Sequence, residues 1–403
     1  MTNLPQGWEV KTLSEIGEIV TGSTPSKSNL DFYGKDYPFF KPSDFEQGYF
    51  LENAGDNLSK LGFGKARQLP PKTILVVCIG SLGKVALTKV IGSCNQQINA
   101  IIPHKNIISE YIYYYCISSK FQSILFSKAP QTTLAILNKT EFSKLEIIYP
   151  KDIKEQERIV GILDFAFSKI DENIKKAKEN LANIDELMQS ALQKAFNPLN
   201  DNTKENYQLP QSWEWKSLGD TSNYGKTSQV KPSQLKGNDW ILELEDIEKE
   251  SGVLLQKVLF QDRQSKSNKI KFNKGDILFG TLRPYLKKVI IADDNGACSS
   301  EIMPFSTGNS ITNHFIYYYL FANFLHDRIS SLTYGARMPR LGTKDGKSLQ
   351  IPLPPLKEQE QITKHLDFIF EKAKALKELY TKELKDYEEL KQSLLDKAFK
   401  GEL

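Results

Sequence analysis

The chain has 403 residues, of which 40% are hydrophobic and 25% are charged, and its formal net charge is +4 at pH 7. This length suits two globular domains, and the composition excludes a chain that is disordered throughout. A net charge this small neither indicates nor excludes a nucleic-acid partner, so the distribution of charge along the chain matters more.

Four cysteines and four histidines are scattered without the spacing of a zinc site or a disulfide framework. They are Cys78, Cys94, Cys116, Cys298, His104, His314, His326 and His365. We therefore expect no metal site. The first residues lack the features of a signal peptide, and the longest apolar runs are too short to cross a bilayer. These features predict a reduced, soluble, cytoplasmic protein.

The first 150 residues predict a mixed domain of short strands between Gly, Pro, Asn and Ser breakers. Thr73–Ile79 reads as a strand, and the tyrosine-rich 111–115 reads as a buried helix. Residues 57–109 contain no Asp or Glu. Basic residues recur in that stretch, at Lys60, Lys65, Arg67, Lys72, Lys84, Lys89 and Lys105. Such a run indicates either a surface that binds phosphates or a basic face with no ligand.

Residues 152–196 predict one long helix, because they contain no Pro and a single Gly, Gly161. Apolar or small residues recur at alternating spacings of four and three, which is typical of a coiled-coil seam. They are Leu163, Phe167, Ile170, Ile174, Ala177, Leu181, Ile184, Met188, Ala191 and Ala195. A helix of about 44 residues is roughly 66 Å long, so it leads the chain far from the first domain.

The remainder of the chain repeats this arrangement. Matching segments recur in order at a nearly constant offset of 203 to 205 residues. They are 4–9 with 209–214, 111–115 with 315–319, 154–157 with 357–360, 163–165 with 366–368, and 194–196 with 397–399. The chain is therefore an internal duplication. In the second copy, Asp276–Gly280 reads as the counterpart of the strand at 73–79.

The second copy also has a locally basic stretch, from Arg263 to Ala292, in which Asp276 is the one acid. A later loop, 333–344, is rich in Gly and in side chains able to contact bases, and its counterpart at 129–139 carries different polar groups. Arginine pairs well with guanine, whereas Asn and Gln pair with adenine. Two domains of one design with different loops would read different sequences, although ordinary divergence of surface loops explains the same pattern.

The second long helix carries a looser seam. Its members are Leu366, Ile369, Ala373, Leu376, Tyr380, Leu384, Tyr387, Leu390, Leu394 and Ala398. The first helix is the evident partner for this seam, and antiparallel pairing uses both seams without an extra linker. The predicted fold is α+β: two duplicated mixed α/β domains joined by two long antiparallel coiled-coil helices, with pseudo-twofold symmetry. The alternative is that each helix packs on its own domain.

We find no phosphate-binding loop of the GxxxxGK[ST] type, no glycine-rich cofactor loop and no tetrapeptide typical of amino-methylating enzymes. Gly80–Gly83 resembles part of a nucleophile elbow but lacks the spacing and a paired histidine. These observations predict a chain that is not itself an enzyme.

The order domain, long helix, domain, long helix resembles the specificity (S) subunit of Type I restriction–modification systems, HsdS. The resemblance covers essentially the whole chain and includes Leu-Pro-x-x-Trp at 4–8 and 209–213, Gly-Ser-Thr-Pro-Ser at 22–26, and Ile-Pro-Leu-Pro-Pro-Leu-Lys-Glu-Gln-Glu-Gln-Ile at 351–362. The first copy departs from the last motif at 149–153, and the second departs from the glycine loop at 224–228.

The resemblance implies target recognition domains at 1–150 and 199–353 and long spacer helices at 151–198 and 354–403. Each domain would bind one half of a bipartite double-stranded DNA site, and the helices would set the spacing and dock two methyltransferase (M) subunits. Restriction (R) subunits would join the full complex. S-adenosylmethionine, ATP and Mg would reside on these partner subunits, with no cofactor bound by this chain.

Most of the expected DNA contacts lie in the basic stretches and the variable loops. For base reading we expect Gln131, Asn138, Arg283, Arg337, Arg340 and Lys344. For phosphates we expect Lys27, Lys41, Lys72, Lys84, Lys287 and Lys288. No catalytic residues are expected. Two alternatives remain at this point: a duplicated coiled-coil scaffold that binds no nucleic acid, and a diverged nuclease or methyltransferase.

Overall fold

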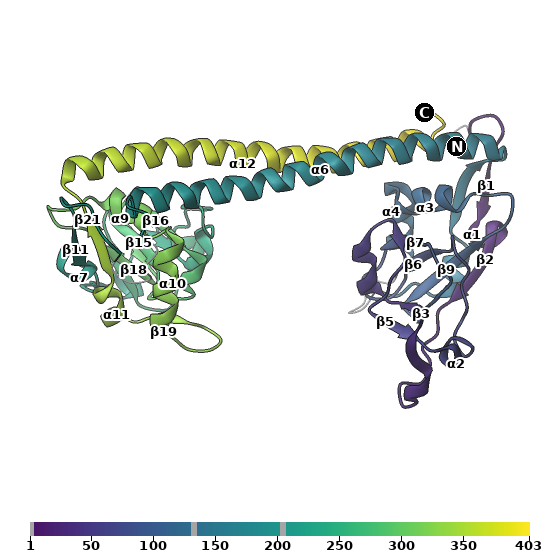
Figure 1. The fold of residues 1–403 in the computed structure, drawn as a ribbon, viewed down its shortest axis with the longest axis horizontal. Helices are drawn as coiled ribbons and strands as arrows, with labels where there is room; N and C mark the ends of the chain where they lie inside the picture. Colours follow the sequence, from purple (N-terminus) through teal and green to yellow (C-terminus); the bar gives the residue numbers. More distant parts are fainter. Residues whose placement is uncertain (1–3, 130–134, 202–206) are drawn as a thin grey trace. The chain divides into compact units, whose positions relative to one another are not determined.

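The computed structural model describes residues 4–129, 135–201 and 207–403, and it divides the chain into two compact units. The first unit comprises Met1–Ala177 and Lys382–Leu403, and the second comprises Lys178–Thr381. Each unit combines one globular part with segments of both long helices (Figure 1).

The globular part of the first unit contains a five-stranded sheet in the order β2-β9-β6-β7-β4. A three-stranded sheet, β5-β3-β8, and the antiparallel pair β1-β10 complete its strands. The strands are β1 (Trp8–Thr12), β2 (Gly17–Thr21), β3 (Tyr33–Phe40), β4 (Phe50–Leu51), β5 (Asp56–Leu58), β6 (Ile74–Val77), β7 (Val85–Thr88), β8 (Ser93–Cys94), β9 (Ile98–Pro103) and β10 (Glu146–Pro150). The α-helices are α1 (Leu13–Ile16), α2 (Lys60–Phe63), α3 (Ser109–Ile117), α4 (Ser119–Lys128) and α5 (Lys139–Ser143).

The globular part of the second unit contains sheets in the orders β12-β14-β17-β13 and β16-β15-β18, with the pairs β11-β21 and β19-β20. The strands are β11 (Glu214–Ser217), β12 (Gln229–Val230), β13 (Trp240–Leu242), β14 (Lys269–Phe272), β15 (Ile277–Gly280), β16 (Val289–Ile291), β17 (Gly296–Cys298), β18 (Ile302–Phe305), β19 (Thr333–Tyr334), β20 (Arg340–Leu341) and β21 (Gln350–Leu353). The α-helices are α7 (Leu218–Thr221), α8 (Phe260–Arg263), α9 (Asn313–Tyr319), α10 (Asn323–Leu332) and α11 (Thr343–Ser348).

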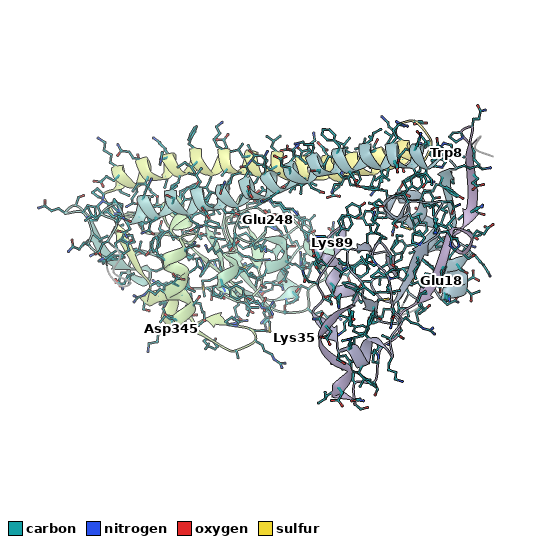
Figure 2. All side chains as sticks on the ribbon, turned by 45° about the vertical axis from the view of Figure 1, so that its right-hand side comes forward. Trp8, Glu18, Lys35, Lys89, Glu248 and Asp345 are labelled. Atoms are coloured by element: carbon teal, nitrogen blue, oxygen red, sulfur yellow. The ribbon has the colours of Figure 1, made fainter. Side chains whose placement is uncertain are left out.

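The elements predicted for each copy are confirmed. The strand expected at 73–79 is β6, and its counterpart is β15; every residue of both strands is buried. The tyrosine-rich segments form α3 and α9, whose rings belong to the two main cores. Trp8, from the repeated Leu-Pro-x-x-Trp motif, packs against the first core (Figure 2). Among the described residues, no helix combines the length and apolar character needed to span a membrane.

The two long helices are α6 (Ile153–Phe196) and α12 (Leu356–Ala398), close to their predicted bounds. A fully buried glutamine anchors the first turn of each helix to its own domain. Gln156 accepts a hydrogen bond from the backbone N–H of Ile108 (2.9 Å) and donates to the carbonyl of Pro150 (2.9 Å). Gln359, the corresponding residue of α12, accepts a hydrogen bond from the backbone N–H of Thr312 (2.9 Å). Buried amides need such partners, which explains the glutamine of the repeated Lys-Glu-Gln-Glu.

A second repeated contact holds each helix about two turns further along. The Tyr114 hydroxyl donates to Asp164 Oδ1 (2.6 Å), and the Tyr318 hydroxyl donates to Asp367 Oδ1 (2.5 Å). These bonds account for the aspartate of the repeated Leu-Asp-Phe motif.

The far end of each long helix packs on the other copy's domain. In the first unit, Phe399, just after α12, meets the Tyr115 ring edge-on with centroids 5.0 Å apart. In the second unit, Phe196 meets Tyr319 in the same way at 5.1 Å. Helix α6 therefore starts on the first domain and ends on the second, and α12 does the reverse. The repeated Lys-Ala-Phe marks these helix ends.

Within each unit the two helical segments pair, as Figure 1 shows. Lys391 lies 2.5 Å from Asp171 in the first unit, and Lys377 contacts Asp185 in the second. The α6 number rises from 171 to 185 while its partner's number falls from 391 to 377, so the pairing is antiparallel. This prediction is confirmed.

All ten predicted seam residues of α6 are buried or half-buried. The prediction for α12 is wrong at two positions, because Leu376 and Leu390 are 41% and 46% exposed. Their neighbours Lys377 and Lys391 occupy the seam instead and form the two ion pairs across it. The long aliphatic stem of lysine can pack there while its ammonium reaches an aspartate on the facing helix.

Candidate nucleic-acid interface

In each copy, the loop that follows β6 or β15 contacts the later variable loop at 129–139 or 333–344. In the second unit, the loop after β15 bridges to the β19-β20 hairpin: the N–H of Leu341 donates to the Thr281 carbonyl (2.9 Å), and that of Arg283 donates to the Pro339 carbonyl (2.7 Å). In the first unit, the N–H of Leu137 donates to the Cys78 carbonyl (2.9 Å). Among the described residues of both domains, therefore, the same two loops join into one composite surface.

The loop after β15 has an unusual backbone. Arg283 and Lys287 both adopt left-handed conformations, with φ of 49° and 46°. Such a conformation costs a non-glycine residue about 1–3 kcal/mol and persists where surrounding contacts hold it. The hydrogen bond from Arg283 to Pro339 is one such contact. The other is Lys287, whose ammonium donates to the Phe321 carbonyl (3.1 Å) and contacts Asn323.

The four base-reading candidates of the second unit lie in or next to these loops. Arg283 is exposed. Arg337 is exposed at the tip of the β19-β20 hairpin, and no partner is seen for it among the described residues. Arg340, in β20, is half-buried with its guanidinium 3.7 Å from Glu301. Lys344 is exposed in the first turn of α11. The isolated bridge between Leu282 and Arg340 brings Arg283 and Arg340 into one surface.

The base-reading candidates of the first unit are fewer. Asn138 is exposed and caps α5, where its Oδ1 accepts a hydrogen bond from the Glu141 N–H (2.9 Å). Its side-chain NH₂ group can still donate outward. Gln131 lies outside the described residues.

Most of the lysines expected at phosphates already have acidic or carbonyl partners. Lys72 lies 2.9 Å from Glu110, Lys84 lies 2.5 Å from Glu46, and Lys41 pairs with Asp56. Lys288 donates to the Leu244 carbonyl (2.7 Å). Lys27 is exposed and has no partner among the described residues. Lys27 is therefore the one expected phosphate contact whose ammonium has no hydrogen-bond or ion-pair partner among the described residues.

The expected phosphate contact at Lys287 requires correction. The residue is 6% exposed, and its ammonium already donates to the Phe321 carbonyl and contacts Asn323. These contacts anchor the loop to which Lys287 belongs. Burial lowers the pKa of this ammonium from its usual value. Lys287 thus positions the Arg283 loop and cannot reach a DNA backbone from this site.

The basic stretches also carry less unpaired positive charge in the structure than their sequences suggest. Arg263 forms two 2.7 Å hydrogen bonds to the fully buried Asp246, and Lys269, only 3% exposed, lies 2.6 Å from Glu243. In the first unit Lys89 pairs with Glu52 (2.7 Å). These acids lie outside the basic stretches in sequence, so the absence of acids within a stretch did not predict an unpaired surface.

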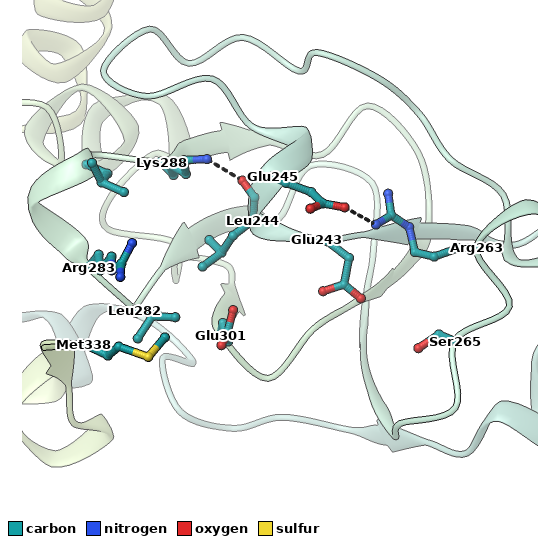
Figure 3. Close-up of a pocket in the computed structure, with 11 residues that line it drawn as sticks. Glu243, Leu244, Glu245, Arg263, Ser265, Leu282, Arg283, Lys288, Glu301 and Met338 are labelled. Atoms are coloured by element: carbon teal, nitrogen blue, oxygen red, sulfur yellow. Dashed lines mark hydrogen bonds and ion pairs between the residues drawn. The ribbon is translucent and has the colours of Figure 1, made fainter. Parts of the chain in front are cut away.

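A pocket of about 580 Å³ opens beside the Arg283 loop (Figure 3). Its lining mixes both signs of charge, with Arg263, Arg283 and Lys288 facing Glu243, Glu245 and Glu301. Leu244, Leu282, Leu286 and Met338 supply its apolar surface. Donors and acceptors of this kind, on a rigid frame, can recognise the hydrogen-bonding edge of a base.

Glu243 and Glu301 were missed by the sequence reasoning. Glu243 occupies the position of Lys41 in the first copy, on the same turn: the Glu243 N–H donates to Asp246 Oδ2 (2.8 Å), and the Lys41 N–H donates to Asp44 Oδ2 (2.7 Å). The shared signal in the sequence is an aspartate three residues later in both copies. One frame therefore presents a carboxylate in one domain and an ammonium in the other.

Comparison with known proteins agrees with this architecture. Residues 5–183 and 210–385 match the family described as Type I restriction modification DNA specificity domain. The HindI specificity subunit of Haemophilus influenzae is 39% identical over 176 residues, which are 42% of this chain and 38% of that protein. The EcoDI specificity subunit of Escherichia coli is 23% identical over an alignment covering 99% of this chain and 89% of that protein.

Two solved structures share the fold. One, from work on complex assembly and conformational transition of the type I R-M system, has a TM-score of 0.79 at 19% identity, with all of both chains covered. The other, the HsdS subunit of Thermoanaerobacter tengcongensis, has a TM-score of 0.54 at 20% identity, covering 99% of this chain and 98% of that one. With its two matched domains, each completed by a paired long helix, this chain belongs to the Type I restriction modification DNA specificity domain family.

Proposed function

We propose that this chain is the sequence-reading subunit of a Type I restriction–modification complex, and that each domain binds one half of a bipartite DNA site. The observation that carries the proposal is the repeated composite surface, in which one backbone frame holds different polar side chains in the two domains. A shared frame fixes how each domain docks on the duplex, and the differing side chains select different bases.

The antiparallel pair α6-α12 is the element proposed to set the distance between the half-sites. Each helix ends on the domain of the other copy, so both domains are fastened to both helices. Two half-sites of different sequence, separated by unread bases, are what such a duplicated reader would require.

The chemistry is proposed to lie on partner subunits. We propose that two methyltransferase subunits bind the helix pair and carry S-adenosylmethionine, and that restriction subunits with ATP and Mg join them. This chain would be non-catalytic and would work in the cytoplasm, where the chromosome is accessible to a modification enzyme.

Binding to duplex DNA tests this proposal against a scaffold that binds no nucleic acid. The chain, purified with its methyltransferase partner, should bind a random-sequence duplex at low salt, with an affinity that falls steeply as salt rises. No binding at any salt concentration would favour the scaffold. Methylation or cleavage by the chain alone, given DNA and cofactor, would show an enzyme instead.

Lys27→Ala should weaken binding to all DNA sequences alike and reduce the magnitude of the salt slope by about one, because one phosphate contact is lost. Fluorescence anisotropy across a salt series, with specific and random duplexes, measures both quantities. Lys84→Ala is the matched control, and it should change the slope less because Glu46 already neutralises that ammonium. A loss confined to the specific duplex would contradict a phosphate contact at Lys27.

Glu243→Gln should relax one base position of the half-site read by the second domain by about 1 kcal/mol. One carboxylate oxygen of Glu243 is held by the buried Lys269, and the other can accept from the exocyclic amine of cytosine or adenine. The amide keeps one oxygen for Lys269 but loses the second acceptor, so it weakens the base contact and tolerates other bases. Sequencing of methylated sites in cells provides the measurement. Lys41→Gln, at the equivalent place in the first domain, should leave the bases selected by the second domain unchanged. Changes in the wrong half-site from either variant would refute the assignment.

A further inference from the structure

The far part of each long helix carries a glutamine at the same position of the repeat, because Gln189 of α6 and Gln392 of α12 lie 203 residues apart. Gln189 is half-buried, and its Oε1 accepts a hydrogen bond from the backbone N–H of Asn323 (3.1 Å), the first residue of α10. Gln392 is exposed, and its Oε1 accepts from the N–H of Ser119 (3.1 Å), the first residue of α4. N–H groups at a helix start have no partner within that helix, and each glutamine supplies one.

A second hydrogen bond reinforces each of these junctions. In the second unit, Gln189 Nε2 donates to the carbonyl of Phe321 (3.2 Å), just before α10. In the first unit, the Ser119 hydroxyl donates to Oδ1 of Asp396 (2.9 Å), one turn beyond Gln392. Each long helix is therefore bonded to the start of a short helix in the domain of the other copy.

The two short helices in turn hold the loops after β15 and β6. In the second unit, the Lys287 ammonium donates to the carbonyl of Phe321 (3.1 Å) and contacts Oδ1 of Asn323. These are the same two residues that the glutamine of α6 binds. In the first unit, Gln122 of α4 donates from its Nε2 to the carbonyl of Gly83 (2.9 Å), in the loop after β6. A continuous path of contacts thus leads from each long helix to one loop of the composite surface.

These two loops follow the same backbone course. Gly80 and Arg283 are each the third residue after their strand, and both are left-handed, with φ of 82° and 49°. Gly83 and Lys287 are each the second residue before the next strand, with φ of 89° and 46°. Glycine adopts this conformation at little cost, whereas arginine and lysine need contacts that hold them in it. The course of the loop that presents Arg283 therefore depends on the anchor at the start of α10.

We propose that Gln189 and Gln392 are positioning residues for base reading, and that they act through α10 and α4 on the loops after β15 and β6. This inference rests on the proposed function. Neither glutamine contacts DNA; each fixes where a loop presents its polar groups. Hydrogen bonds to base edges weaken steeply when distance or angle changes, so base reading is sensitive to the position of the loop. The half-site read by each domain thus depends on a residue in the long helix of the other copy.

The alternative is that the two glutamines only fasten a helix to a domain. Weaker fastening would lower the fraction of chains that can bind DNA, and the affinity for every duplex would fall by the same factor. The ratio of affinities for matched and substituted duplexes would then stay unchanged. A displaced loop changes that ratio, but only at the bases the loop helps to read. This ratio therefore separates positioning from a purely structural role.

The experiment uses the full-length chain with its methyltransferase partner, in competition binding with duplexes substituted singly at each position of both half-sites. Gln189→Ala should reduce discrimination about fivefold at one or more bases of the half-site read by the second domain, as expected for the loss of a hydrogen bond. The other half-site should be unchanged. Gln392→Ala should affect only the half-site of the first domain, by about twofold, because this side chain is exposed and makes one of the two bonds.

Gln193→Ala is the matched control, since Gln193 is half-buried one turn further along α6 and no hydrogen bond of its side chain is seen among the described residues. It should leave discrimination in both half-sites unchanged. Adding Gln189→Ala to Lys287→Met should cause no further loss, because both side chains act on the same anchor.

An equal loss of affinity for all duplexes, or no change from Gln189→Ala, would overturn the inference. So would a change confined to the half-site of the opposite domain. In each of these cases the unmodified chain would still discriminate between duplexes, and the proposed function would stand. Failure of the unmodified chain to discriminate at any position would instead refute the proposed function.

Discussion

Insertion of seven residues into each long helix, after Ala177 in α6 and after Thr381 in α12, is expected to lengthen the unread spacer of the DNA site by about three base pairs. Seven helical residues add about 10.5 Å, and B-DNA rises about 3.4 Å per base pair. A heptad also returns the seam to its original face. Both half-sites should keep their sequences, because neither composite loop surface is altered.

The two insertion points lie between the ion pairs Asp171–Lys391 and Asp185–Lys377, so each pair can form as before. The matched control places the same insertion in α6 alone. That variant moves one pair out of register and should lose stability and methylation rather than gain a longer spacer. Sequencing of methylated sites in cells reads the outcome. An unchanged spacer in the double-insertion variant would remove the role of the helix pair in setting the distance.

Arg337→Ala should relax recognition of one base in the half-site read by the second domain, by about 1–3 kcal/mol. Arg337 is exposed at the tip of the hairpin that carries Arg340. No partner of Arg337 is seen among the described residues, so the substitution leaves no group there unpaired. The fold should therefore be unaffected. Competition binding with duplexes substituted at each position measures the change.

Arg67→Ala provides the comparison for this variant, since Arg67 is an exposed arginine of the first unit. It should leave the half-site of the second domain unchanged. If Arg337→Ala weakened every duplex equally, the residue would be a phosphate contact. If neither specificity nor affinity changed, the hairpin tip would lie outside the DNA interface.

The helices and their pairing were predictable because they depend on periodicity. A seam of alternating spacing specifies which face of α6 is turned inward, and all its members are buried or half-buried. Lys377 and Lys391 occupy the seam in place of Leu376 and Leu390, and this could not be predicted. Each lysine pairs with an aspartate of α6, and the sequence alone does not show which residues of the two helices lie opposite one another. The anchoring by Gln156 and Gln359 likewise appeared in the sequence only as a repeated motif.

The electrostatics of the surface could be predicted only in part. The acids that neutralise Lys72, Lys84 and Lys89 come from segments outside the basic stretch, and long-range pairing of this kind leaves no local signal. Burial of Lys287 depends on the carbonyl of Phe321, more than 30 residues away in the chain. Lys41 and Glu243 carry opposite charges. Their equivalence could be recognised only in the structure, where they occupy equivalent turns of the two domains.

The most direct test of the central claim is the pattern of methylated sites in cells that express this chain with its methyltransferase partner and lack other modification systems. Two short specified blocks, separated by a fixed number of unread bases, are the predicted result. A single uninterrupted motif, or blocks whose separation varied from site to site, would contradict reading by two domains fastened to one helix pair.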